Sequence, residues 1–267
     1  MTGVVRDMEA VQYHIGLSRA MLCGARYVFL PGDPDRVGPI ASFLDRSMEL
    51  VQHREYRSAL GYVGNIPVLV MSTGIGAPST GIAIEELARL GVTYFLRLGT
   101  TGAIQPHIAL GDLIISEGAV RLEGTSGHYA PVEFPAVASL PLTQKVVEAA
   151  LHHHFSYQTG ICCSSDSFWP GQERYDSFSG YVQRRFQGSL EEWQHLGVLN
   201  FEMETSALFT IARTFGLHAA SLCGVIAVRT QGESVREGVY AQVKERLARV
   251  ARETVRRHAA WAGAQDG

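Results

Sequence analysis

Apolar residues in this chain fall into two kinds of segment. In the first kind they form short continuous runs, which are typical of strands buried on both faces of a sheet. Such runs predict strands at residues 27–30, 67–71, 92–98, 111–116 and 219–228. In the second kind they recur every three or four positions or follow a helix-start signal. These segments predict helices at residues 34–44, 78–90, 142–152, 205–215 and 235–260.

The order of these segments indicates the fold class. Residues 67–98 read as strand, helix and strand, with Gly91 just past the helix. This order predicts a parallel pair of strands with a right-handed crossover. The continued alternation predicts an α/β protein with additional antiparallel strands. We find no linker, repeat or low-complexity tract, so a single domain is expected over residues 1–267.

Composition narrows the classes of partner. The 267 residues are 46% hydrophobic, which is enough for a large core, and the formal net charge is −3. This mildly acidic balance disfavours nucleic acid and membrane surfaces. The polar N-terminal segment has no apolar signal core and no apolar run reaches membrane-spanning length, so we expect a soluble, cytoplasmic protein. The four cysteines form no CxxC pair, and buried free thiols are expected rather than a zinc site.

One charged residue interrupts the apolar run at residues 92–98. Arg97 lies near the end of this predicted strand, and a loop of sequence Gly-Thr-Thr-Gly follows at residues 99–102. Burying a guanidinium costs several kcal/mol unless an anion or an acid meets it. Backbone N–H groups and hydroxyls of small residues suit a phosphate. Arg97 therefore indicates either a phosphate ligand or a partner of a structural carboxylate.

A second arginine lies at a predicted helix start. Asp33 suits an N-cap, Pro34 suits the first helical position, and Arg36 lies within the first turn. A helix N-terminus beside an arginine forms an anion site. The alternative is an ordinary strand–turn–helix connection with a solvated Arg36.

A polar loop carries the groups that a pyrimidine would need. Gln172 and Arg174 follow Phe168 and a Pro-Gly turn. A glutamine amide can bond to O2 and N3–H of uracil, an arginine can donate to O4, and an aromatic ring can pack on the base. The alternative is a structural loop pinned by aromatic residues.

Two acids lie at the entrance to the helix predicted at residues 205–215. Glu204 can accept hydrogen bonds from both hydroxyls of a ribose. Alternatively, Glu202 and Glu204 are acids of a first helical turn that stabilise the helix dipole.

A set of long segments gives these separate signals a common meaning. In chain order they are PGDPDR, HREY, STGIGAPST, FLRLGTTGAIQP, SSDSFWPGQERYD, GSLEEWQ, NFEMET and GVIAVRTQ. With His14 they span most of the chain and closely resemble the bacterial uridine phosphorylases of the nucleoside phosphorylase-I family. The resemblance implies a three-layer α/β/α fold with a mixed central sheet. It also implies reversible phosphorolysis of uridine to uracil and ribose 1-phosphate, in pyrimidine salvage, with inorganic phosphate as co-substrate and no organic cofactor.

The resemblance also implies roles for individual residues. Those matching the phosphate ligands are Gly32, Arg36, Arg97 and Thr100, with Arg54 contributed by a neighbouring subunit. Those matching the ribose contacts are Met203 and Glu204, with Glu202 beside them and the neighbour's His14 at the 5′-hydroxyl. Those matching the uracil pocket are Phe168, Gln172 and Arg174, with Arg229 near the base. Catalysis is expected from Arg97, Gln172, Arg174 and Glu204.

Assembly and a cation follow from the same resemblance. Glu55, Ser79 and the Ile75 carbonyl match a monovalent-cation site, for K⁺, between subunits of some members. Since His14 and Arg54 would serve a neighbour's site, a homodimer is the expected minimal unit, repeated into a hexamer as a trimer of dimers. The expected ligands are a small nucleoside and phosphate.

Base choice can be read from one position. Purine-cleaving relatives place an acid, typically Asp, near the end of the late strand, whereas this chain has Val228, Arg229 and Thr230 there. Val228 replaces a more usual Asn and Trp169 replaces a Tyr. The alternatives are a purine nucleoside phosphorylase or nucleosidase of the same family, and a nucleoside-binding protein without catalysis.

Overall fold

The computed structural model describes residues 9–230 and 237–265. Its strands are β1 (Tyr27–Leu30), β2 (Arg46–His53), β3 (Tyr56–Val63), β4 (Ile66–Met71), β5 (Tyr94–Ala103), β6 (Leu113–Leu122), β7 (Ala136–Val137), β8 (Tyr157–Ser165), β9 (Asn200–Glu202) and β10 (His218–Val228). Its α-helices are α1 (Val37–Ala41), α2 (Ala77–Leu90), α3 (Leu140–His152), α4 (Ser189–His195), α5 (Thr205–Thr214) and α6 (Glu237–Gln265). Short 3₁₀ turns complete the described part of the chain, among them η2 (Pro34–Arg36), η4 (Pro170–Gln172) and η5 (Arg184–Phe186).

All these strands join one mixed sheet. Its order is β10-β6-β8-β9-β5-β1-β4-β3-β2, with β7 beside β6 and an additional pairing of β10 with β5. The β5–β10 pairing is parallel and closes the end of the sheet into a ring of five strands. The strand–helix–strand unit is confirmed in its parallel sense, but β4 and β5 do not pair with each other. Each pairs with β1, which lies between them.

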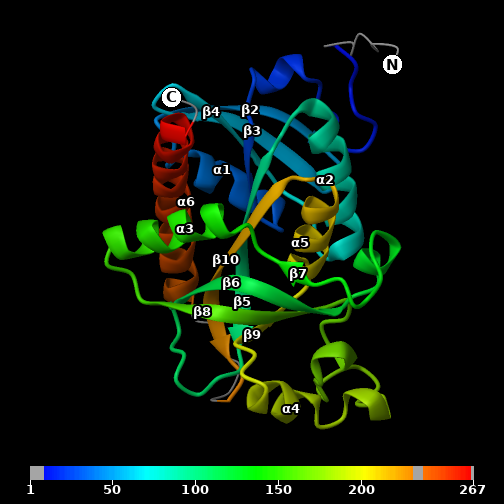
Figure 1. The fold of residues 1–267 in the computed structure, drawn as a ribbon. Helices are drawn as coiled ribbons and strands as arrows, with labels where there is room; N and C mark the ends of the chain where they lie inside the picture. The colour runs from blue at the N-terminus through cyan, green and yellow to red at the C-terminus, as the bar shows by residue number, and fades with distance from the viewer. Residues whose placement is uncertain (1–8, 231–236, 266–267) are drawn as a thin grey trace.

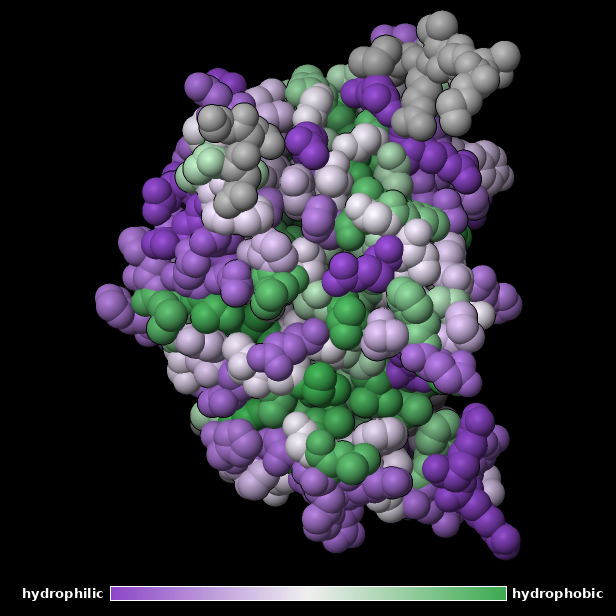
Figure 2. Space-filling model, in the orientation of Figure 1, coloured by the Kyte–Doolittle hydropathy of each residue, from purple (hydrophilic) through white to green (hydrophobic). Residues whose placement is uncertain are grey.

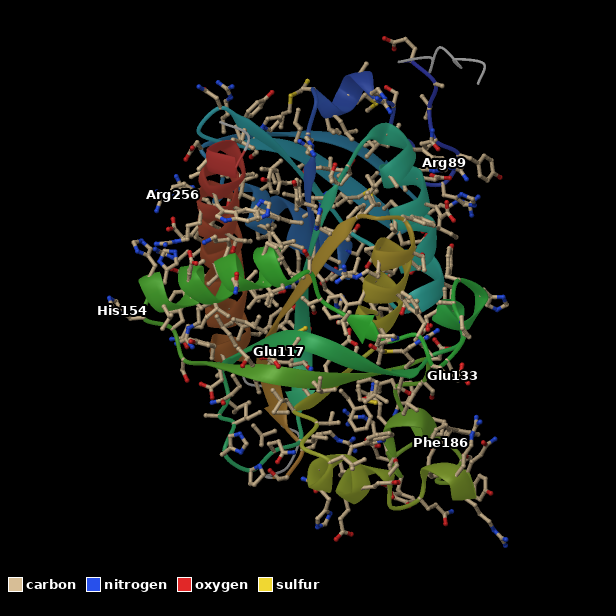
Figure 3. All side chains as sticks on the ribbon, in the orientation of Figure 1. Arg89, Glu117, Glu133, His154, Phe186 and Arg256 are labelled. Carbon is tan, nitrogen blue, oxygen red and sulfur yellow. The ribbon has the colours of Figure 1, made fainter. Side chains whose placement is uncertain are left out.

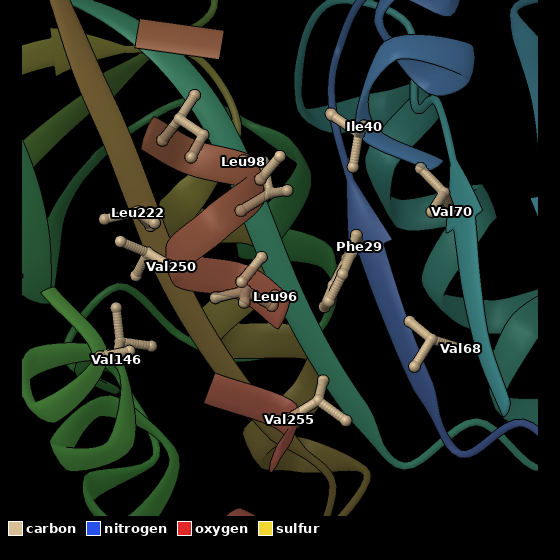
Figure 4. Close-up of a cluster of buried hydrophobic side chains, with 14 of the residues drawn as sticks. Phe29, Ile40, Val68, Val70, Leu96, Leu98, Val146, Leu222, Val250 and Val255 are labelled. Carbon is tan, nitrogen blue, oxygen red and sulfur yellow. The ribbon is translucent and has the colours of Figure 1, made fainter. Parts of the chain in front are cut away.

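Helices cover both faces of the sheet (Figure 1). Alternate residues of β1 point to opposite faces, so that Phe29 joins the core under α1, α3 and α6, and Val28 joins the core under α2 and α5. Figure 4 shows the first of these cores, with Leu96 and Leu98 of β5 beside Val250 of α6. This arrangement confirms the three-layer α/β/α fold and explains why the core strands read as continuous apolar runs.

The segment after Arg97 differs from its predicted conformation. Residues 99–102 continue β5 rather than opening into a loop. These residues pair with β10 on one side, and Gly102 pairs with Phe201 of β9 on the other. Ladder hydrogen bonds to two distant segments outweigh the low strand propensity of glycine. Gly99 also fits because a Cβ there would lie 2.5 Å from Cys223 Sγ.

Other element boundaries shift by a few residues. The helix expected at residues 34–44 begins as η2 and ends at Ala41, and α3 begins two residues before its predicted start. The predicted start of the last helix at Val235 lies outside the described residues. Among the described helices, none is long and apolar enough to cross a membrane. Three of the four cysteines are buried and all four are free, as expected.

Candidate active site

A cavity of about 370 Å³ opens where several strands end. It lies at the carboxyl ends of β1, β5 and β10, which run to the lower part of the molecule in Figure 1. Ligands of open α/β sheets bind at this edge. Its lining combines Gly32, Asp33, Arg36, Ile75, Arg97, Gly99, Thr100, Thr101, Gly102, Phe168, Gln172, Arg174, Phe201, Glu202, Met203, Glu204, Ile226, Ala227 and Tyr240. The four segments predicted to carry chemistry, which contain Arg36, Arg97, Gln172 and Glu204, therefore all line one cavity.

Arg36 is the buried cation of this cavity that lacks an acid partner. The Asp33 side chain caps η2 by accepting from the N–H of Asp35, which holds Arg36 in the first turn. The residue is only 4% exposed, and its Nε and Nη2 atoms have no hydrogen-bond partner among the described residues. Burial lowers the pKa of Arg36. A buried guanidinium with unused donors is a site prepared for an anion.

Arg97 is bound on two sides by acids. Its Nε lies 3.0 Å from Glu202 Oε2, and its Nη2 lies 2.5 Å from Glu204 Oε2. Burial alone would lower the pKa of Arg97, but the carboxylates of Glu204 and Glu202 raise it above the ordinary value. The interpretation of Arg97 as the partner of structural carboxylates is therefore confirmed, and because the residue also lines the cavity, its role as a phosphate ligand stays a prediction.

Glu202 and Glu204 have different surroundings. The Glu202 side chain is fully buried, and its Oε2 also accepts from the backbone N–H groups of Glu204 and Thr205 at 2.9 Å, capping α5. Its Oε1 accepts from the Ser164 hydroxyl. Glu204 accepts from the N–H of Gly76 at 2.6 Å, and burial raises the pKa of its carboxyl against the opposing effect of Arg97. Glu204 thus lines the cavity as the less heavily bonded carboxylate.

The residues predicted to bind the base line the same cavity. Gln172 ends η4 and is buried, and the Arg174 guanidinium lies 4.1 Å from the Phe168 ring centroid. Burial lowers the pKa of Arg174. These side chains belong to the segment between β8 and α4, in the lower right of Figure 3 where Phe186 is labelled. The three predicted uracil ligands therefore line one wall together.

Arg229 contacts the backbone of the segment that forms this wall. It is not among the described residues that line the cavity. Its Nη1 donates to the backbone carbonyl of Gln172 at 2.5 Å, and its own N–H donates to the carbonyl of Ala103. Burial and the neighbouring Arg174 lower the pKa of Arg229 to about 10. The geometry connects Arg229 to the backbone that carries Gln172.

Several predicted residues lie away from this cavity within a single chain. His14 and Arg54 do not line it, and both lie near the β2–β3 edge, beside Tyr13. Glu55 and Ser79 lie close together instead, around Gly74. A Cβ on Gly74 would be 2.8 Å from Glu55 Cγ and 3.5 Å from Ser79 Oγ. Among the described residues, no group of three His, Cys, Asp or Glu could hold a metal ion.

Known proteins resemble this chain in sequence. A model of the phosphorylase superfamily matches residues 26–256, which is most of the chain. The chain belongs to the phosphorylase superfamily. The match includes β1, β5 and β10, the strands whose ends surround the cavity.

Curated members of the phosphorylase superfamily resemble the chain over most of its length. The uridine phosphorylase of Klebsiella aerogenes is 49% identical over 245 residues, covering 92% of this chain and 97% of the relative. The uridine phosphorylase of Thermococcus kodakarensis is 46% identical over 95% of this chain and 88% of the relative. The guanosine phosphorylase of Halorubrum lacusprofundi is 34% identical over 85% of this chain and 90% of the relative.

Sequence reasoning missed some of the residues that line the cavity. Tyr240 reaches the cavity from the first turns of α6, and Ile226 and Ala227 reach it from the end of β10. The register of β5 against β10 shifts between Val225 and Ala227, so Ile226 forms a bulge at the cavity wall. No local signal marks Tyr240, because only the packing of α6 on the sheet brings it to the site.

Proposed function

We propose that this protein is a uridine phosphorylase. It catalyses the reversible attack of inorganic phosphate on C1′ of uridine, giving uracil and ribose 1-phosphate. The observation that carries the proposal is that one cavity is lined both by buried Arg36, whose Nε and Nη2 have no partner among the described residues, and by Gln172 with Arg174. The 46–49% identity to uridine phosphorylases over most of the chain supports the same substrate.

The phosphate binds at the end formed by Gly32, Arg36, Arg97 and Thr100. Gly32 has no side chain, so a phosphate oxygen can approach its backbone closely. A Cβ at this position would lie only 3.2 Å from the Gly74 carbonyl oxygen. Arg36 supplies Nε and Nη2, and Arg97 contributes charge while remaining fixed by its two carboxylates. A fixed cation beneath C1′ holds the nucleophile without reorganisation during the reaction.

The ribose lies between the two ends, against Met203 and Glu204. Glu204 is the carboxylate with which the hydroxyls would bond, and its contact with Arg97 links ribose binding to phosphate binding. As the glycosidic bond stretches, the ribosyl centre gains oxocarbenium character, and the phosphate stabilises this cation before bonding to it. No covalent enzyme intermediate or organic cofactor enters this scheme.

The departing uracil gains negative charge on O2 and O4. Arg174 and Arg229 lie close enough for their charges to repel, and this repulsion contributes to the lowered pKa of Arg229. Negative charge that develops on the base relieves the repulsion, so this end stabilises the transition state more than the bound substrate. Glu173 and Asp176 offset part of the positive charge in the resting site.

Two features distinguish this proposal from its alternatives. A nucleosidase uses water and has no need of a buried Arg36 whose Nε and Nη2 lack a partner in the described part of the chain, which supports phosphate as the nucleophile. A purine enzyme needs an acid at the base, whereas Val228 and Arg229 occupy the end of the late strand. The guanosine phosphorylase relative is also less similar in sequence than the uridine phosphorylases above. A binding protein without catalysis would not need both ends of the cavity.

A homodimer completes the site in this proposal. His14 Nε2 and the Arg54 guanidinium make no hydrogen bonds with the described residues, and Arg54 adopts a left-handed φ of 56°. Such a conformation is costly for arginine and is typical of functional positions. Self-association into a hexamer is supported by exposed apolar residues over α3 and the β6–β8 region (Figure 2), which include Val137, Leu140, Leu151 and Ile161.

The proposed cation site lies near the β2–β3 edge, next to Arg54 in the chain. Glu55, Ser79 and the Ile75 carbonyl offer a carboxylate, a hydroxyl and a carbonyl, which are the oxygen ligands that a hard cation prefers. The Ser79 hydroxyl lies 3.4 Å from the Ile75 carbonyl oxygen. These oxygens would hold K⁺ together with the same groups of a second subunit. A cytoplasmic location stays a prediction.

The decisive experiment measures nucleoside cleavage with and without phosphate. Uridine should be cleaved only when phosphate is present, with ribose 1-phosphate as the sugar product, and inosine should be a poor substrate. Equal cleavage without phosphate would identify a hydrolase, and faster cleavage of inosine would identify a purine enzyme.

A mixing experiment tests the shared site. Arg54→Ala damages the donated part, and Arg36→Met damages the receiving part. Each variant alone should have strongly reduced activity, and reassembly of the two together should restore part of the activity, because some dimers contain one site built from two intact halves. If mixed dimers form without any recovery, each subunit builds its site alone.

A further inference from the structure

A buried carboxylate on α2 holds the segment that contains His14. Glu86 is 5% exposed, and its Oε2 accepts from the backbone N–H groups of His14 and Ile15 at 3.0 and 2.9 Å. Its Oε1 lies 2.7 Å from His14 Nδ1. In Figure 3, Arg89 on the same helix is labelled at the upper right, beside the N-terminal segment. Three N–H donors from a distant part of the chain thus converge on one acid.

This contact fixes the state of the imidazole. A carboxylate only accepts hydrogen bonds, so Nδ1 must carry a proton toward Glu86. The His53 ring donates to the His14 carbonyl at 2.8 Å, and Tyr13 packs edge-on against the imidazole at 4.9 Å between ring centroids. The ring is therefore held by Glu86 and Tyr13, while His53 holds the backbone of the same residue. Its remaining nitrogen, Nε2, belongs to a side chain that is 37% exposed.

The same cluster includes Arg54. Its guanidinium carbon lies 5.6 Å from the Tyr13 ring centroid, so Tyr13 lies between the two groups that the proposed dimer donates. Neither group reaches the cavity of its own chain. The rigidity of this cluster therefore has no use within the subunit's own site.

We infer that Glu86 is a positioning residue for the neighbouring subunit's active site. It holds His14 in the Nδ1-protonated form and presents Nε2 to the 5′-hydroxyl of the ribose bound across the dimer. This inference rests on the proposed function and on the contact with the ribose 5′-hydroxyl that the family resemblance implies for His14. The 5′-hydroxyl is remote from the bond that breaks, so its contact serves to bind and orient the ribose.

The control residue is the one that precedes Glu86 on the helix. Glu85 is also an α2 carboxylate, but it contacts Tyr129 and Arg89 and has no contact with His14. Glu86→Gln keeps the size of the side chain and removes its charge, and Glu85→Gln makes the same change without touching His14. A general effect of charge on α2 would therefore appear in both variants.

The test compares uridine with 5′-deoxyuridine, which lacks the hydroxyl that His14 contacts. Glu86→Gln should lower kcat/KM for uridine by about tenfold, as expected for loss of a ligand's supporting group, and should leave 5′-deoxyuridine nearly unchanged. Glu85→Gln should change neither value. In the His14→Ala background, Glu86→Gln should have no further effect on uridine, because the effect passes through His14.

Three results would overturn the inference. One is an equal loss for both substrates in Glu86→Gln, which would indicate a general structural role. Another is a result in which His14→Ala lowers kcat/KM for uridine but not for 5′-deoxyuridine, while Glu86→Gln leaves the ratio of the two kcat/KM values unchanged. The third is an additive loss in the double variant. If Glu86→Gln does not fold, Glu86→Asp withdraws the carboxylate from Nδ1 while keeping its charge, and the same ratio is measured. Failure of the proposed function is separate, since the wild-type protein would then not cleave uridine.

Discussion

Arg36 offers the sharpest test because the same side chain should favour phosphate binding and lower the stability of the phosphate-free protein. Its Nε and Nη2 atoms are buried without partners among the described residues. Each unsatisfied buried donor costs about 1–3 kcal/mol. Arg36→Met keeps much of the side-chain length and removes both donors. We therefore expect the free energy of unfolding in phosphate-free buffer to rise by about 2 kcal/mol or more.

The same substitution should remove phosphate binding. A desolvated, charge-assisted contact is worth about 3 kcal/mol, so kcat/KM for phosphate should fall by about a hundredfold. Phosphate at a hundred times its Kd stabilises the wild-type protein by about 2.7 kcal/mol, and this stabilisation should disappear in the variant.

The assay combines urea unfolding at fixed protein concentration, with and without phosphate, and initial rates of uridine phosphorolysis. Arg57→Met is the matched control, because Arg57 already pairs with Glu49 near the surface and should change neither phosphate affinity nor rate appreciably. A variant of Arg36 that is clearly less stable than wild type without phosphate, or that retains near-normal phosphorolysis, would refute the reasoning.

Three further predictions concern the base, a glycine and a buried histidine. Cytidine should be a very poor substrate, because its exocyclic amine brings a donor to Arg174, and equal rates on cytidine and uridine would contradict the assignment. Gly99→Ala should lower kcat/KM because its Cβ would meet Cys223 Sγ at 2.5 Å, and Cys223→Ala should restore part of it; no restoration would exclude this clash as the cause. Burial lowers the pKa of His258 to about 4, so the unfolded chain binds this proton first as pH falls. The free energy of unfolding should therefore drop by about 3 kcal/mol between about pH 6.5 and 4, and His258→Gln should flatten that profile measured by urea unfolding.

Local chemistry in the sequence was sufficient to predict the helix start at Asp33 and the position of Arg36 in the first turn. Both depend on residues that are adjacent in the chain, namely an N-cap acid, a proline and the arginine of the first turn. The same holds for the continuous apolar runs, because burial on both faces leaves no polar face to interrupt them.

Features that depend on distant pairing were beyond the sequence. Residues 99–102 read as a loop until β10 and β9 are placed on either side of them. The sequence left open whether Arg97, the single charge in its strand, meets a phosphate or a structural carboxylate. The structure shows that Glu202 and Glu204 already share its guanidinium, while Arg36 has donors to spare. The ligand roles of these residues stay predictions.

The parallel pairing of β5 with β10 has a consequence for how the chain folds during synthesis. The two strands lie far apart in sequence, and α6, which covers them with Leu247, Val250 and Ala251, leaves the ribosome after all the other described elements. Until then the face of β5 that carries Leu96 and Leu98 has no cover. Contacts between distant segments form slowly, and uncovered apolar strands are prone to aggregate. A nascent chain of this protein therefore needs protection until α6 has been synthesised, and truncation within α6 should yield insoluble protein rather than a smaller folded one.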